Sequence, residues 1–109
     1  MKKLLLSFLA LASFSATVLA QGEASLKTAD KKLKNYKYDR EKNADDLVIA
    51  LEEISKVETG SEAGSSVKYF LTLGAINKEL AANPTFSPDH PDAPINAFEA
   101  LSQVGTAEG

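Results

Sequence analysis

The sequence predicts an all-α fold in which about four helices form antiparallel hairpins. Four stretches carry apolar residues at spacings of three and four, which places those residues on one side of a helix. Short segments rich in charged residues, glycine, serine or proline separate the stretches, and short connections favour antiparallel neighbours. After residue 20, no segment alternates between polar and apolar residues with period two, so no strand is predicted.

The N-terminal residues 1–20 have the pattern of a signal peptide. Lys2 and Lys3 give a positive head, and the apolar run over residues 4–12 is followed by small and polar residues that end at Ala20. The alternative is a membrane anchor, but the apolar span is diluted by hydroxyl side chains and falls short of the ~20 strongly apolar residues that cross a bilayer. We therefore expect cleavage after Ala20 and a helical domain over residues 21–109.

The composition excludes several classes of function. The chain has no cysteine, which rules out a cysteine nucleophile, a thiolate zinc site, a disulfide scaffold and a lipid anchor on a new N-terminal cysteine. Metal-ligand chemistry is concentrated in the loop sequence Asp89-His90-Pro91-Asp92, where one imidazole is too few ligands for a zinc site. We expect no enzymatic activity, no cofactor and no metal, and an exported protein that is periplasmic or secreted. An enzyme that uses His90 is a minor alternative.

The first two helices are each predicted from one apolar stripe. From Ala24 to about Tyr38 the apolar positions recur every three or four residues, and they are Leu26, Ala29, Leu33 and Tyr36. After a charged turn over residues 39–42, Asn43 and Asp46 resemble a capping pair that starts a second helix. That helix has the cleanest stripe of the chain, formed by Leu47, Ala50, Leu51, Ile54 and Val57.

The third helix, over residues 67–82, is predicted to contact neighbours on two sides. Two apolar stripes lie side by side on it and together cover more than half of its circumference. Ser65 or Ser66 is a suitable N-cap. Asn83-Pro84 ends the helix, because a residue that precedes proline avoids the helical conformation.

The fourth helix follows a proline-rich loop over residues 83–91. Asp92 can cap it, and Pro94 is tolerated in its first turn. Gly105 is expected to end it. The expected inward face consists of Ile95, Phe98 and Leu101, extended by Val104.

The spacing Phe70-x-x-Leu73-Gly74-x-x-Asn77 resembles the first-helix signature of tetratricopeptide repeats, W-x-x-L-G-x-x-Y. In that pattern the glycine removes a side chain where the partner helix crosses closest, and the bulky residue four positions earlier fills the space beside the crossing. Ala50, with Ile54 and Val57 after it, looks like the second-helix half of a preceding repeat. The chain is also similar to the N-terminal part of exported bacterial repeat proteins.

The sequence departs from the family pattern in two places. Asn77 stands where the family has an aromatic residue. In the fourth helix, either Phe98 is the bulky residue, with Pro94 and Leu101 at the small positions, or Ala97 replaces the bulky residue, with the small positions taken by Ala93 and Ala100. The alternative to a repeat fold is an unrelated four-helix bundle.

The resemblance implies a non-enzymatic scaffold whose stacked hairpins bind a protein or peptide partner. Asn77 and Tyr69 are candidates for its exposed face, although Tyr69 fits the core equally well. About one and a half repeats are present where three or more are usual, so we expect either the N-terminal part of a longer protein or self-association. The alternative function is a small structural bundle of the periplasm that associates with itself.

Charge is distributed unevenly along the chain, whose formal net charge is −3. Residues 21–42 have seven basic and four acidic residues, whereas residues 43–109 have three basic and eleven acidic ones. A basic first helix could contact anionic lipid or nucleic acid. Export argues against nucleic acid, and the interleaved acidic residues favour a solvated face, so we expect membrane contact only during export.

Overall fold

The computed structural model describes residues 22–108, and over this range the predicted all-α fold is confirmed. The helices span residues 22–38, α2 (Ala44–Ser55), α3 (Val67–Ala82) and α4 (Ala93–Glu108). Short 3-10 turns lie at Ala63–Ser65 and Ser87–Asp89. The signal peptide predicted for residues 1–20 lies outside the described residues. Within the described range, no helix has both the length and the hydropathy of a membrane span.

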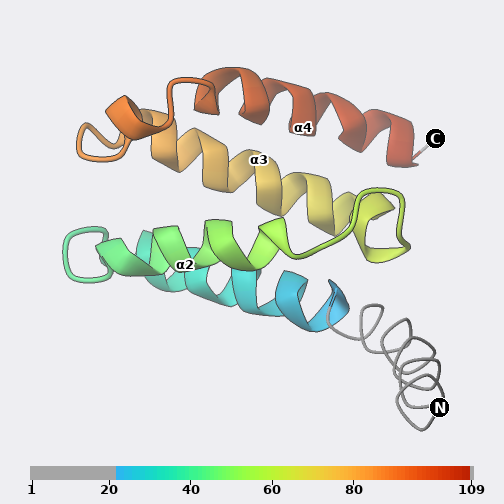
Figure 1. The fold of residues 1–109 in the computed structure, drawn as a ribbon, viewed down its shortest axis with the longest axis horizontal. Coiled ribbons are helices and arrows are strands. Elements are labelled where there is room, and N and C mark those ends of the chain that lie inside the picture. Colours follow the sequence, from blue (N-terminus) through green and yellow to red (C-terminus); the bar gives the residue numbers. More distant parts are fainter. Residues whose placement is uncertain (1–21, 109) are drawn as a thin grey trace, which may run out of the picture.

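Successive helices run in opposite directions, and α3 lies between α2 and α4 (Figure 1). The helix over residues 22–38 packs beside α2 and also reaches α3. At the start of α3, Lys68 Nζ lies 3.9 Å from Asp30 Oδ2 of the first helix. After the end of α3, Asn83 Nδ2 donates a hydrogen bond to the hydroxyl of Tyr36. These contacts at both ends make the first helix parallel to α3.

The hydrophobic core lies where the first helix, α2 and α3 meet. Ala50 is fully buried in α2. The other core side chains are the predicted stripes of the first two helices together with the inner side of α3, and they include Leu26, Ala29, Leu33, Tyr36, Leu47, Ile54, Val57, Ile76 and Leu80. Burial of these apolar side chains is the main force that holds the helices together.

The two ends of α3 follow from its sequence. Ser66 Oγ accepts a hydrogen bond from the backbone N–H of Tyr69 at 3.1 Å, which satisfies a donor that the first helical turn leaves free. At the other end, Asn83 has an extended backbone (φ −92°, ψ 114°) before Pro84, which ends the helix. Both boundaries agree with the prediction.

The predicted capping role of Asn43 is wrong. Asn43 occupies the N-cap position of α2 but makes no side-chain cap bond. Its Nδ2 instead donates to the backbone oxygen of Asn35 at 2.7 Å. The same oxygen also accepts a longer bond, 3.4 Å, from the backbone N–H of Asp39, so the amide of Asn43 ties the turn to the last turn of the preceding helix.

The predicted inward face of α4 is also wrong. Ala93, Ala97 and Ala100 are the buried residues of this helix, whereas Phe98 is 73 % exposed. Ile95 and Leu101 are exposed as well. The helix crosses α3 at Gly74, where the backbone of Ala97 and the side chain of Leu101 lie closest. Small alanine side chains on the buried side of α4 allow this close approach, and Leu101 packs over the glycine from the edge of the contact. Of the two alignments left open by the sequence, the arrangement places Ala93, Ala97 and Ala100 at the packed positions.

Gly105 does not end α4, which continues to Glu108. A glycine inside a helix costs up to about 1 kcal/mol relative to alanine but does not force termination. Within residues 22–108, a positive φ is found at Gly60 (+88°), in the turn between α2 and α3. That turn is where the freedom of glycine is needed.

Candidate functional site

The structure separates the five residues of the predicted motif into three places. Ala50 lies in the core, and Gly74 lies at the crossing of α3 and α4. Phe70, Leu73 and Asn77 line an open groove along α3. Gly74 and the groove-lining residues are therefore adjacent on α3 but have different neighbours.

This groove, called here the α3 groove, runs between α2 and α4 and has a volume of about 400 Å³. Its lining combines two kinds of side chain. Apolar and aromatic contacts come from Leu51, Tyr69, Phe70, Leu73 and Ala100. Amide groups come from Asn77, Asn96 and Gln103.

Two adjacent aromatic residues lie at one end of the α3 groove. The rings of Tyr69 and Phe70 are 5.2 Å apart and meet edge to face, an arrangement favoured by the charge distribution of aromatic rings. Burial raises the pKa of the Tyr69 phenol above its ordinary value. A tyrosine hydroxyl is protonated at neutral pH and can donate a hydrogen bond.

The amide side chains in the α3 groove differ in exposure. Asn77 is 5 % exposed, and its Nδ2 donates to the backbone oxygen of Leu73 at 2.9 Å. The expectation that Asn77 lies on an exposed face is therefore wrong, because its position on α3 turns it between α2 and α4. Asn96 and Gln103 are exposed on α4, where each amide can both donate and accept hydrogen bonds.

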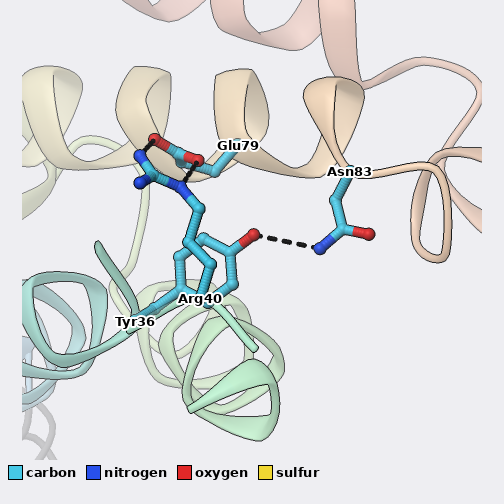
Figure 2. A network of polar contacts seen from close by, with 4 residues as sticks. All are labelled: Tyr36, Arg40, Glu79 and Asn83. Carbon is cyan, nitrogen blue, oxygen red and sulfur yellow. Dashed lines mark hydrogen bonds and ion pairs between the residues drawn. The ribbon is translucent and has the colours of Figure 1, made fainter. Parts of the chain in front are cut away.

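A second hollow, the end cleft, has a volume of about 790 Å³ and lies near the C-terminal ends of the first helix and α3. Figure 2 shows its polar network. Arg40 Nε and Nη2 donate to the two carboxylate oxygens of Glu79 at 3.1 and 2.9 Å. Asn83 Nδ2 donates to the hydroxyl of Tyr36 at 3.0 Å, and the guanidinium of Arg40 lies 5.8 Å from the centre of the Tyr36 ring.

The polar groups in the end cleft are paired with one another by hydrogen bonds and an ion pair. The hydrogen bond from Arg40 holds the pKa of Glu79 below its ordinary value, and Glu79 in turn raises the pKa of Arg40. Both side chains are therefore charged and paired at neutral pH. The ion pair links the turn after the first helix to α3, so we assign these two residues a structural role.

The loop around His90 does not form a metal site in the described part of the chain. Ser87–Asp89 is a 3-10 turn, and His90 directly after it is half-buried. No group of three or more histidine, aspartate or glutamate side chains between residues 22 and 108 is placed to hold an ion. The α3 groove is therefore the candidate site.

No protein-family model, curated protein or solved structure matches this chain. The resemblance of residues 70–77 to a tetratricopeptide repeat stays an interpretation of the sequence.

Proposed function

We propose that this chain is a non-enzymatic, exported helical-repeat protein that binds a peptide segment of a partner protein in the α3 groove. The observation that supports the proposal is the lining of that groove. Side chains from α2, α3 and α4 converge there, so the three helices together hold the contact residues in place. Export is part of the proposal through the signal peptide predicted for residues 1–20.

The lining suits an extended peptide because a peptide presents both apolar side chains and backbone amides. Tyr69, Phe70 and Leu73 offer an apolar surface to one or two side chains of the peptide. Asn96 and Gln103 can donate to backbone carbonyls and accept from backbone N–H groups of the same segment. The volume of the groove, about 400 Å³, is within the ordinary range of ligand sites.

The charges around the groove favour a neutral or basic peptide. Glu99 of α4 is in the lining. Residues 43–109, which contain α2, α3 and α4, have eleven acidic and three basic residues. An acidic peptide would approach this surface against repulsion, whereas a lysine or arginine in the peptide can face Glu99.

The proposal is tested by selecting short random peptides that bind the purified protein and by measuring their affinity with fluorescence polarisation. The variant Asn96→Ala/Gln103→Ala removes two exposed amides from the groove without touching the core. We expect it to weaken binding about tenfold, which corresponds to about 1.4 kcal/mol. Ser102→Ala, elsewhere on the same helix, is the matched control and should bind normally. Equal affinities of both variants, or a failure to select any peptide, would contradict the proposal.

A further inference from the structure

The N-terminus of α2 opens at the end cleft without a side-chain cap. Ala44, the first residue of α2, is part of the lining of the cleft. The first N–H groups of a helix have no partner within it, and together with the helix dipole they attract an anion. Asn43 stands at the N-cap position, but its amide is bound to the backbone oxygen of Asn35 instead. Among the described residues, no atom accepts a hydrogen bond from the N–H of Ala44.

The hydroxyl of Tyr36 is a second donor in the end cleft, and the orientation of the Asn83 amide establishes this. The backbone N–H of Thr85 can only donate, and it donates to Oδ1 of Asn83 at 2.9 Å. The other end of this amide, Nδ2, is therefore the donor in the 3.0 Å bond to Tyr36 (Figure 2). Within residues 22–108 the hydroxyl makes no second hydrogen bond, so its own proton is not used. Tyr36 is 1 % exposed and lines the end cleft, where a bound acceptor can take up this proton.

The ion pair in the end cleft leaves further N–H groups unused. Arg40 binds Glu79 through Nε and Nη2, so the N–H groups of Nη1 have no partner among the described residues. The bonds to Glu79 also hold the guanidinium in one position, which reduces the cost of adding another partner. Lys78 is exposed, and its ammonium group forms no ion pair within residues 22–108. Both cationic side chains are part of the lining.

The charges around the end cleft favour a ligand with a single negative charge. The carboxylates of the lining are Glu41, which is exposed to water, and Glu79, whose two oxygens are bound by Arg40. The hydrogen bond from Arg40 lowers the pKa of Glu79, and the charges of Lys37 and Lys78 add to this effect, so both ammonium groups lie near the carboxylate. Three cations therefore surround two carboxylates. An anion with two charges would be repelled more strongly by those carboxylates.

The helix ends that would repel an anion are covered by hydrogen bonds. The first helix and α3 end near the cleft, and the C-terminal end of a helix carries a partial negative charge. The backbone oxygen of Asn35 accepts from Asn43 and Asp39, and the backbone oxygen of Glu79 accepts from the N–H of Asn83. The start of α2 has no such cover, so the positive end of a helix is the accessible one.

Other walls of the end cleft are apolar. They are formed by Ala44, Ala82, Pro84 and Phe86. Phe86 packs partly against the hydrophobic core, so its ring is held in place. The volume of about 790 Å³ is within the range of small-molecule sites, which combine apolar walls with a few polar groups. An inorganic anion would leave these walls without a partner, whereas an organic anion covers them.

We propose that the end cleft binds a small organic carboxylate, with its charged group near the start of α2 and its apolar body on Pro84 and Phe86. A carboxylate carries one charge and two acceptor oxygens, and hydrogen bonds to a charged acceptor are stronger than those to a neutral one. Its oxygens take up the unused donors of Ala44 and Tyr36, and Arg40 and Lys78 balance its charge.

The test is an NMR titration of the protein purified after export with acetate, hexanoate and phenylacetate, with sodium chloride added to keep the ionic strength constant. Saturable chemical-shift changes should appear at the amides of Ala44 and Thr85, with dissociation constants on the order of millimolar for ligands of this size. Hexanoate and phenylacetate should bind about fivefold more tightly than acetate, because their bodies cover the apolar walls. No saturable change at these amides with any of the three acids would overturn the proposal.

Two further ligands test the chemical class. Phenylacetamide has the shape of phenylacetate without its charge, and inorganic phosphate has charge without an apolar body. Each should bind about tenfold more weakly than phenylacetate. Binding of phenylacetamide as tight as that of phenylacetate would show an apolar pocket with no role for charge. Binding of phosphate as tight as that of phenylacetate would show an inorganic anion site. Either result would overturn the proposal.

Matched variants test the donors. Tyr36→Phe removes a hydroxyl and keeps the ring, and Tyr38→Phe makes the same change on a tyrosine that is 91 % exposed. Phenylacetate should bind about fivefold more weakly to the first variant and normally to the second. Lys78→Gln, with Lys31→Gln on the first helix as its control, gives a second comparison on exposed residues that do not affect folding. Equal affinity within either pair would overturn the proposal. The end cleft and the α3 groove share no lining residue, so these results are independent of peptide binding.

Discussion

The side chain of Leu101 packs directly over Gly74, too close for a Cβ atom at that position. An added Cβ at Gly74 would lie 2.8 Å from both Cγ and Cδ2 of Leu101, and 3.6 Å from the backbone oxygen of Ala97. Real Cβ atoms do not approach other atoms to within 3.0 Å, so the contact requires glycine or a displaced Leu101. The pair therefore sets how closely α4 lies on α3.

Gly74→Ala and Gly105→Ala should have different effects on stability. Both glycines lie inside helices, where alanine is favoured by up to about 1 kcal/mol. Gly105 has open space around its Cα, so Gly105→Ala should raise the free energy of unfolding by about that amount. In Gly74→Ala the displacement of Leu101 should cancel most of this gain. Urea denaturation measures the free energy of unfolding of both variants.

A double variant isolates the contact between the two residues. In Gly74→Ala/Leu101→Ala the clash is absent, so the change at Gly74 should again stabilise by about 0.5–1 kcal/mol relative to Leu101→Ala alone. If Gly74→Ala stabilised the native protein as much as Gly105→Ala does, the close approach of α4 would be refuted.

Ser66→Ala should destabilise the protein by about 1 kcal/mol, because the N–H of Tyr69 loses its cap. Thermal unfolding followed by circular dichroism measures the change. Ser65→Ala is the matched control, since Ser65 is exposed and is not the N-cap of α3. A larger loss from the Ser65 variant than from the Ser66 variant would show that the cap is assigned to the wrong serine.

The ion pair between Arg40 and Glu79 should make stability depend on pH below about 4.5, the ordinary pKa of a glutamate. Arg40 lowers the pKa of Glu79 in the folded protein, so the unfolded chain binds a proton more readily. The stability that this pair contributes is fully present above pH 4.5 and is lost as the pH falls through the lowered pKa.

Glu79→Gln removes this contribution. The variant should therefore be less stable than the native protein at neutral pH, and the difference should shrink in acid. Unfolding curves recorded at several pH values measure it, with Glu52→Gln on the exposed side of α2 as the control. A difference that stayed constant from neutral to acidic pH would contradict the role of the pair.

Asn77→Tyr should block the α3 groove. The family pattern has an aromatic residue at this position, and Asn77 lies on the groove floor with little space beneath it. A tyrosine ring would extend into the groove, so peptide affinity should fall at least tenfold while the helices remain folded. Circular dichroism checks folding, and fluorescence polarisation checks binding. Peptide binding of native strength in a folded Asn77→Tyr variant would show that the peptide binds elsewhere.

Local sequence patterns predicted all four helices, the core faces of the first two and both ends of α3. The stripes of the first helix and α2 become the core, and the ends of α3 follow from Ser66 and Asn83. These features depend on neighbours in the sequence, through helix periodicity, capping and the effect of proline.

The rotation of α4 could not be predicted in the same way. Hydropathy ranks Ile95, Phe98 and Leu101 above alanine as inward residues, but the distance between α3 and α4 decides which side chains fit. Because the rotation of α4 was predicted incorrectly, the sequence did not identify Asn96 and Gln103 as residues that line the α3 groove. Arg40 and Glu79 are 39 positions apart in the sequence, so no local pattern predicts that they pair.

Peptide binding in the α3 groove can be located by titrating the isotope-labelled protein with a selected peptide and following its amide resonances by NMR. We expect the largest chemical-shift changes at Tyr69 and Leu73 and at the side-chain amides of Asn96 and Gln103. Largest shifts at Arg40 and Glu79 in the end cleft, with the groove resonances unmoved, would contradict it.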